Sequence, residues 1–244
     1  MRGWHKESYR HYLASKGVKT AKYRVPPAWK HVTYPEGKPY VATGVDDKGR
    51  TQYIYPIKFT DRTSKAKFRR IKRFEKDAPQ IISRVKSDIK HGDNSEAEVV
   101  YTMYKTGFRP GTDKETLADT KAFGASNLER RHVKVKPKSV EFHFIGKKGV
   151  DIRKEVEDPL LRKIIKRRIT NKKLFEVSDS SLRDYFKSRT GGKYKLKDLR
   201  TLRAAKVATV TKGDNKRVAL VVSEDLGNTP AVALSAYIPP EVLR

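Results

Sequence analysis

Tyr237, close to the end of the chain, is the residue whose setting most suggests chemistry. It lies in the stretch GNTPAVALSAYIPP (227–240), where small residues precede the phenol and two prolines follow it. The side chain could simply close the core of a last helix, or it could be a nucleophile. Because a phenol is a weak acid, its attack on a phosphodiester needs nearby cations that favour the phenolate and stabilise the pentacoordinate transition state.

Three basic residues in unusual settings could supply those cations. Arg109 lies in TGFRPG after a glycine that ends a predicted helix, Lys147 in the predicted turn GKKG, and Arg200 in LKDLRT. Each alone could be a solvated surface charge, since the chain has 56 Lys and Arg residues. Together with Tyr237, two guanidinium groups could grip phosphate oxygens bidentately, and a lysine could protonate the departing 5′-oxygen. Such a reaction needs neither metal nor ATP, because a phosphotyrosyl bond conserves the energy of the broken phosphodiester.

Other enzyme motifs are missing. GKKG is not a phosphate-binding P-loop, because the pattern GxxxxGK[ST] does not occur. The six histidines form no HExxH motif, and HGDNSE lacks the ligand spacing of a calcium loop. We therefore expect no metal ion, no nucleotide and no other cofactor.

The charge balance indicates a polyanionic partner. The chain has 28 Asp and Glu residues against its 56 Lys and Arg, a formal net charge of +28. Such a charge repels itself unless phosphates neutralise it, and counterion release favours nucleic acid as the partner. A membrane surface is the weaker alternative, since no apolar run approaches the roughly 18 residues of a membrane span. The absence of cysteine excludes disulfides, thiolate zinc sites and cysteine nucleophiles. Residues 1–17 contain no apolar run, so we expect that they are not a secretory signal.

We predict an α+β protein of two domains. Residues 1–58 should form a small β-rich N-terminal module, with strand-like runs at 40–43 and 52–55 and turn signals at PEG and DKG. Residues 1–24 should add a short helix or an arm. Residues 59–244 should form a mainly helical catalytic domain with one small three-stranded antiparallel sheet.

The helical domain should begin with a helix from about Asp61, which is interrupted at Pro79 and ends near Gly92. A second helix should run over 95–107, and TDKE (112–115) reads as the capping box of a third. Alternating apolar residues in 131–157 predict the three strands, with GKKG as their second turn. The remaining apolar spacing predicts helices at 160–165, 182–190 and 196–207, and two last helices on either side of Gly227.

The ordered motifs GFRPG, FIGKKG, KDLRT and GNTPAVALSAYIPP resemble those of the type IB DNA topoisomerases, in particular the small poxvirus- and bacterial-type enzymes. The resemblance implies that Arg109 and Arg200 are the two catalytic arginines and that Lys147 is the β-hairpin lysine acting as general acid. Tyr237 corresponds to the tyrosine that becomes linked to the DNA 3′-phosphate. Asn228 stands where poxvirus members have a histidine and many bacterial members an asparagine. Its amide can donate to a phosphate oxygen but cannot shuttle a proton.

The resemblance covers about 26–237 and extends to DNA contacts. DDKGRTQYIY is similar to the family's N-terminal segment in which a glutamine and two aromatics read the major groove or line the backbone, which implies this role for Gln52, Tyr53 and Tyr55. The two tyrosines could instead be cross-strand packing residues. Arg62 and Lys65 lie in the basic stretch where the two predicted domains join, and we expect them to follow the DNA backbone rather than merely to aid solubility.

The implied activity is cleavage of one strand of duplex DNA, strand rotation and religation, which relaxes supercoils of both signs. We expect Asp198 to orient Arg200 by a charge-assisted hydrogen bond. The expected partner is double-stranded DNA, and the protein should be an intracellular, DNA-associated monomer, in the cytoplasm, at a nucleoid or at a viral replication site.

Two alternatives stay open. A tyrosine recombinase or integrase uses the same chemistry, although recombinases usually carry HxxR where this chain has KDLR (197–200). A non-catalytic basic nucleic-acid-binding protein would explain the charge and nothing else.

Overall fold

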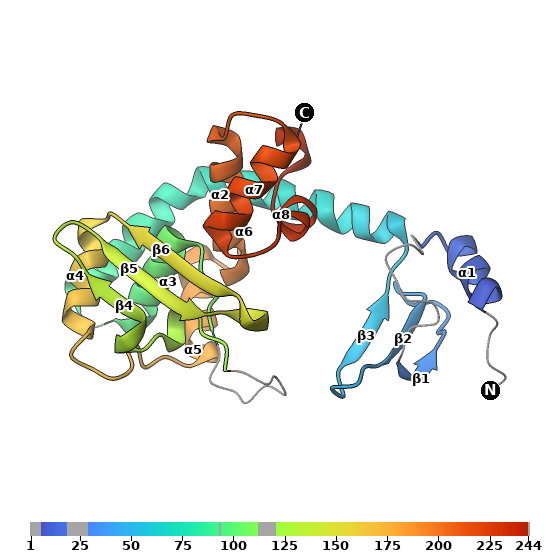
Figure 1. Cartoon of the computed structure of the whole chain (residues 1–244), viewed down its shortest axis with the longest axis horizontal. Coiled ribbons are helices and arrows are strands. Elements are labelled where there is room, and N and C mark those ends of the chain that lie inside the picture. Colours follow the sequence, from blue (N-terminus) through green and yellow to red (C-terminus); the bar gives the residue numbers. More distant parts are fainter. Residues whose placement is uncertain (1–5, 19–28, 93, 112–120, 244) are drawn as a thin grey trace. The chain divides into compact units, whose positions relative to one another are not determined.

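The computed structural model describes residues 6–18, 29–92, 94–111 and 121–243 (Figure 1). The chain is mostly helical with two small antiparallel sheets, and it divides into two units, Met1–Arg69 and Arg70–Arg244. The sequence predicted the boundary between residues 58 and 59, whereas the structure divides the chain inside one long helix, α2 (Ile57–His91). The predicted capping box at 112–115 lies outside the described residues. Within those residues, no helix combines the length and the apolar character needed to cross a bilayer.

The first unit contains α1 (Lys6–Ser15) and an antiparallel sheet of three strands, β1 (Lys30–Thr33), β2 (Ala42–Val45) and β3 (Thr51–Ile54), in that order. The strands predicted at 40–43 and 52–55 correspond to β2 and β3. The sequence missed β1, because its register shifts between Lys30 and Thr33 and His31 has a φ of 53°. A strand this irregular and this exposed does not produce the apolar alternation on which prediction depends.

Helix α2 was expected to be interrupted at Pro79, and this expectation is wrong: the helix is continuous over 35 residues with Pro79 inside it. A proline removes one backbone donor and crowds the preceding turn. Its side chain is exposed, however, while Phe74 and Ala78 before it and Ile82 and Val85 after it are buried. Burial of this apolar stripe on both sides of the proline holds the helix together.

The second unit has the predicted sheet and helices. Strands β4 (Val133–Val135), β5 (Val140–Ile145) and β6 (Asp151–Val156) pair antiparallel in sequence order. Apart from the helix expected at 112–115, the helices predicted after α2 are confirmed. They are α3 (Ser95–Thr106), α4 (Pro159–Arg168), α5 (Asp179–Thr190), α6 (Leu196–Val210), α7 (Asn215–Leu226) and α8 (Pro230–Ala236).

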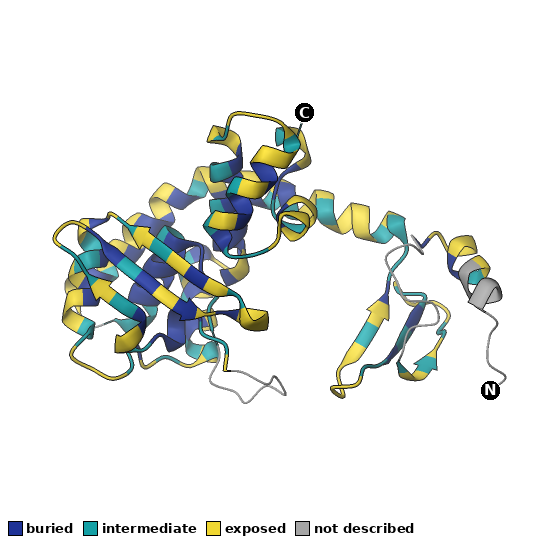
Figure 2. Cartoon of the chain, viewed as in Figure 1, coloured by how far each residue is buried: buried dark blue, intermediate teal, exposed yellow. Residues whose placement is uncertain are grey.

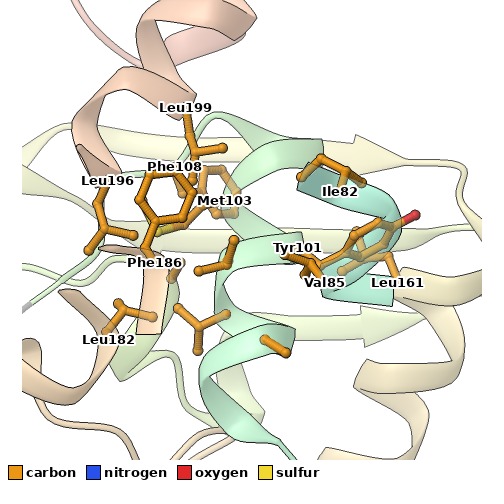
Figure 3. Packing of buried hydrophobic residues seen from close by; sticks show 14 of the residues in the cluster. Ile82, Val85, Tyr101, Met103, Phe108, Leu161, Leu182, Phe186, Leu196 and Leu199 are labelled. Atoms are coloured by element: carbon orange, nitrogen blue, oxygen red, sulfur yellow. The ribbon is translucent and has the colours of Figure 1, made fainter. Parts of the chain in front are cut away.

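Helix α3 lies at the centre of the main core. Most of its residues are buried (Figure 2), and Tyr101 and Met103 are fully enclosed. Figure 3 shows their neighbours, which come from α2, α4, α5 and α6 and include Leu161 and Phe186. A dense core therefore fixes the C-terminal end of α3 and the first turns of α6.

A second, smaller core joins α6, α7 and α8. Its buried residues are mostly small or β-branched: Ala204, Ala208, Val218, Ala219, Val222, Leu226, Ala233 and Ile238, with Tyr237 packed against them. Thr229 caps α8 and Pro230 occupies its first turn. Tyr237 is the C-cap residue directly after α8, and the prolines at 239 and 240 cannot continue the helix. The phenol is thus held at a helix end.

Candidate active site

Arg200 is the most enclosed of the expected catalytic residues, with only 3% of its surface exposed. Its Nη1 donates to the carbonyl of Gly107 (2.7 Å), and its Nη2 donates to the carbonyl of Leu226 (2.7 Å). Gly107 ends α3 and Leu226 ends α7, and the terminal carbonyls of a helix have no partner within it. The guanidinium therefore links two helix ends whose dipoles favour a cation.

Gly107 fits this junction because it has no side chain. Its φ is 72°, a left-handed conformation, and an added Cβ would lie 3.0 Å from both Arg203 Cγ and Leu226 Cδ2. The turn that follows leads directly to Arg109. Backbone bonds fix this turn, since Ala125 N donates to the Arg109 carbonyl (2.8 Å).

Arg109 and Arg200 are electrostatic neighbours. Burial is the main cause that lowers the pKa of Arg200 to about 10, and the positive charge of Arg109 is the next. Arg200 stays protonated at neutral pH, and two guanidinium groups share one site. A pair of like charges held together in this way indicates a place for an anion.

Tyr237 belongs to the same site. Its half-buried ring lies 5.2 Å from the Arg200 guanidinium carbon. A guanidinium over an aromatic ring is an attractive arrangement. The structure thus brings the phenol and a guanidinium from α6 side by side, at the end of α8.

Asn228 adds two polar atoms that have no partner. Its Nδ2 and Oδ1 and the Nε of Arg200 are the three buried side-chain nitrogen and oxygen atoms without a hydrogen bond in the described part of the chain. Leaving such an atom unpaired costs about 1–3 kcal/mol, so native proteins rarely keep one without a reason. All three lie on residues expected from the sequence to contact a phosphate, and a phosphate oxygen would satisfy the two donors.

Lys147 lies at the tip of the β5–β6 hairpin. Gly146 N donates to the Val150 carbonyl (2.8 Å) to close the turn, and Lys148 adopts a φ of 66°. The Lys147 side chain is exposed and makes no hydrogen bond or ion pair within the described ranges. The turn end of β6 lies next to Gly227, since a Cβ on Gly227 would lie 3.1 Å from Ile152 Cγ1 and 3.9 Å from Val150 Cγ1. The structure thus joins Arg109, Arg200, Asn228 and Tyr237, and places Lys147 on a neighbouring, solvent-exposed turn.

Asp198 does not orient Arg200, and that expectation is corrected. Its carboxylate accepts from Arg70 Nε (2.9 Å) and Nη2 (3.0 Å), and from the backbone N–H of Lys195 (2.9 Å). Residues two apart on a helix do not face each other, so Asp198 and Arg200 point in different directions. Asp198 instead caps α6 and ties it to α2.

Sequence reasoning missed a charged group next to the site, formed by Lys154, Arg203 and Asp225. Burial is the main cause that lowers the pKa of Lys154 to about 8. Burial alone would raise the pKa of the Asp225 carboxyl, but hydrogen bonds from Arg203 and Lys154 hold it below its usual value. One signal was present: a carboxylate in the last turn of a helix opposes the helix dipole, so Asp225 needed a cationic partner.

The expected DNA-contacting tyrosines form an aromatic row in the first unit. Tyr53 is 42% exposed, and its ring centroid lies 4.8 Å from that of Tyr40. Tyr55 stacks on Phe59 with centroids 4.8 Å apart, and the Arg62 guanidinium lies 5.9 Å from the Phe59 ring. These contacts include cross-strand packing, and they leave one face of Tyr53 open to solvent.

Gln52 lies on the opposite face of β3 from Tyr53, because successive strand residues alternate. Its Nε2 donates to Asp46 Oδ2 (2.8 Å), and Asp46 also pairs with Arg50 (2.7 Å). The structure therefore separates Gln52 from the aromatic row. Lys65, like Arg62, is exposed on the first turns of α2.

Comparisons with known proteins agree with the order of the motifs. Residues 57–216 match the family model described as the catalytic core of eukaryotic DNA topoisomerase I. This range contains Arg109, Lys147 and Arg200 and ends before Asn228 and Tyr237. The chain is 28% identical over 204 residues to DNA topoisomerase 1B of Acanthamoeba polyphaga mimivirus; the match covers 75% of this chain and 61% of that relative.

Proposed function

Because the chain belongs to the DNA topoisomerase I family, of the type IB class, we propose that it relaxes DNA supercoils by cutting and rejoining one strand of the duplex. Tyr237 Oη attacks the scissile phosphorus as its proton passes to solvent, and the bond from phosphorus to the 5′-oxygen breaks. The products are a 3′-phosphotyrosyl bond and a free 5′-hydroxyl. After strand rotation, that hydroxyl attacks the phosphotyrosyl bond and releases Tyr237.

The single observation that carries the proposal is the set of unpaired buried atoms on Arg200 and Asn228, together with the phenol that lies against the Arg200 guanidinium. Arg200 Nε and Asn228 Nδ2 are donors without acceptors, and Tyr237 lies against the same guanidinium. Donors fixed before the substrate arrives stabilise the charge that develops on the phosphoryl oxygens without further reorganisation. We assign Arg109 and Arg200 to this charge and Asn228 to one oxygen by its amide N–H.

Lys147 is the proposed proton donor for the departing 5′-oxygen. An alkoxide is a poor leaving group, and its protonation as the bond breaks lowers the barrier. The exposed position of Lys147 on a hairpin whose turn end lies next to Gly227 suits a group that meets DNA from the solvent side. In religation, Lys147 takes the proton back from the attacking 5′-hydroxyl.

Duplex DNA is the proposed partner, and the protein acts on it as a monomer without metal ion or nucleotide. In the first unit we assign backbone contacts to Arg62 and Lys65 and groove or backbone contacts to Tyr53 and Tyr55. Gln52 is a weaker candidate for base reading, because Asp46 accepts its amide hydrogen in the free protein.

A suicide substrate tests the reaction directly. A nicked duplex that loses its 5′-hydroxyl fragment should trap the protein on the 3′-phosphate, and peptide mapping should find the adduct on Tyr237. Tyr237→Phe should bind the same duplex and form no adduct. An adduct on another residue, or none with the unchanged protein, would refute the proposal.

Plasmid relaxation separates the enzyme classes. The protein should relax positive and negative supercoils in EDTA without ATP, on a plasmid that lacks any recombination site. A recombinase would leave such a plasmid supercoiled, and so would a binding protein without catalytic activity.

A further inference from the structure

Asp225, three residues before Asn228, is held by side chains from two other elements. Lys154 of β6 donates from Nζ to the Asp225 carbonyl (2.7 Å) and to its Oδ1 (2.8 Å). Arg203 of α6 donates from Nε to Oδ2 (2.9 Å) and from Nη2 to Oδ1 (2.6 Å). Every oxygen of Asp225 is thus bound, in a place where only 15% of its side chain and 10% of that of Lys154 are exposed.

The bonds at the end of α7 connect this group to the active site. A helix leaves its last four carbonyls without partners. The following turn satisfies two of them: Asn228 N donates to Ser223 O (3.0 Å), and Gly227 N donates to Glu224 O (3.3 Å). Lys154 binds the third, on Asp225, and Arg200 binds the fourth, on Leu226. Lys154 and Arg200 therefore hold consecutive carbonyls, and a shift of one displaces the other.

The sheet fixes the same turn from a second direction. Ile152 lies two residues before Lys154 on the same face of β6. Its Cγ1 would lie 3.1 Å from a Cβ added to Gly227. Gly227 takes a left-handed φ of 61°, which a larger residue would not tolerate here. The segment from Asp225 to Asn228 is therefore clamped along β6.

We propose that Asp225, with Lys154 and Arg203, is a positioning residue that sets the Arg200 guanidinium and the Asn228 amide for the scissile phosphate. This inference rests on the proposed strand cleavage. Buried ion pairs contribute little to stability compared with apolar residues of similar size, so a group of three charges at this point serves orientation. None of the three reaches the phosphate in this scheme; they act through the end of α7.

The test separates DNA binding from cleavage. Lys154→Met should bind a duplex suicide substrate within about twofold of the unchanged protein and should cleave it at least tenfold more slowly in single turnover. Lys154→Arg, which keeps a cation and its donors, should recover most of the rate. The matched control is Lys136→Met, in the turn between β4 and β5, whose ammonium pairs with Glu141 and Glu155 away from the active site; it should leave both quantities unchanged.

Three results would overturn the inference. Cleavage by Lys154→Met within twofold of normal would show that the group does not position the site. A proportional loss of binding and cleavage, or no recovery with Lys154→Arg, would indicate a general structural role. If Lys154→Met does not unfold cooperatively, it is not properly folded. Asp225→Asn, which keeps the shape of the side chain, then replaces it, and its binding and cleavage are measured by the same criteria. If the unchanged protein forms no adduct, the proposed function fails instead.

Discussion

Substitution of Asn228 by alanine should cost activity without costing stability. The two polar atoms of its amide are buried and unpaired. At about 1–3 kcal/mol for each unsatisfied group, their removal should favour the folded state by about 2–6 kcal/mol. Truncation also loses packing contacts and opens a small cavity, which costs about 1–3 kcal/mol. The free energy of unfolding should therefore change by about −1 to +5 kcal/mol, which means that it stays nearly the same or rises.

The loss of activity follows from the same atoms. If Nδ2 donates to a phosphoryl oxygen in the transition state, its removal should slow cleavage by about 10²–10³-fold, the usual effect of deleting one such donor. Asn228→His keeps an N–H donor and should retain more activity than Asn228→Ala. Asn228→Asp has nearly the same shape but no donor and a negative charge, so it should be slower than the alanine variant.

The assays are thermal unfolding of the free protein and single-turnover cleavage of a suicide duplex at saturating protein. A stability gain should appear as a rise of about 2–4 °C in the unfolding midpoint for each kcal/mol. A lower midpoint for Asn228→Ala together with an unchanged cleavage rate would refute the reasoning, because the amide would then be a structural group with partners not accounted for.

Three further outcomes are expected. Arg70→Met should lower the free energy of unfolding by about 3–5 kcal/mol in urea titrations, because it leaves the carboxylate of Asp198, which is 1% exposed, without its cation; unchanged stability would contradict this. Removing Arg62 and Lys65 together should reduce the slope of log affinity for DNA against log salt by about 2, one for each lost phosphate contact, whereas an unchanged slope would show that they do not touch the backbone. Because burial lowers the pKa of Lys154 to about 8 from the ordinary 10.5, the folded state binds fewer protons than the unfolded state between these values, so stability should rise with pH across this window. Lys154→Met should remove that part of the rise, and identical pH profiles for the two proteins would contradict the shift.

The parts of the fold that the sequence predicts best are those with strong local signals. Strands β4 to β6 alternate clearly, and α3 is bounded by the Asn94 cap and by Gly107. The irregular strand β1 lacks such a signal. Pro79 shows the opposite failure, since a strong local signal was overruled by the core contacts of the helix around it.

For the site, residue types predicted the chemistry better than spacing predicted the contacts. Arg200 and Tyr237 were identified by their settings, and they do lie together. Asp198 was assigned to its sequence neighbour, but its partner is Arg70, 128 positions away. Lys154 and Asp225 are 71 positions apart, and only the fold, which brings β6 to the C-terminal end of α7, joins them.

The contacts of Arg200 also limit how it can hold a phosphate. A guanidinium has five N–H donors, and two of them are used by the carbonyls of Gly107 and Leu226. Among the remaining donors, Nε–H is buried and has no partner. Nε and Nη2 lie on the same edge of the planar group, and this edge can bind a phosphate through two parallel bonds if the Leu226 carbonyl takes the Nη2 hydrogen that points away from Nε. In the proposed mechanism this edge faces the phosphate, and the unpaired Nε lies on it.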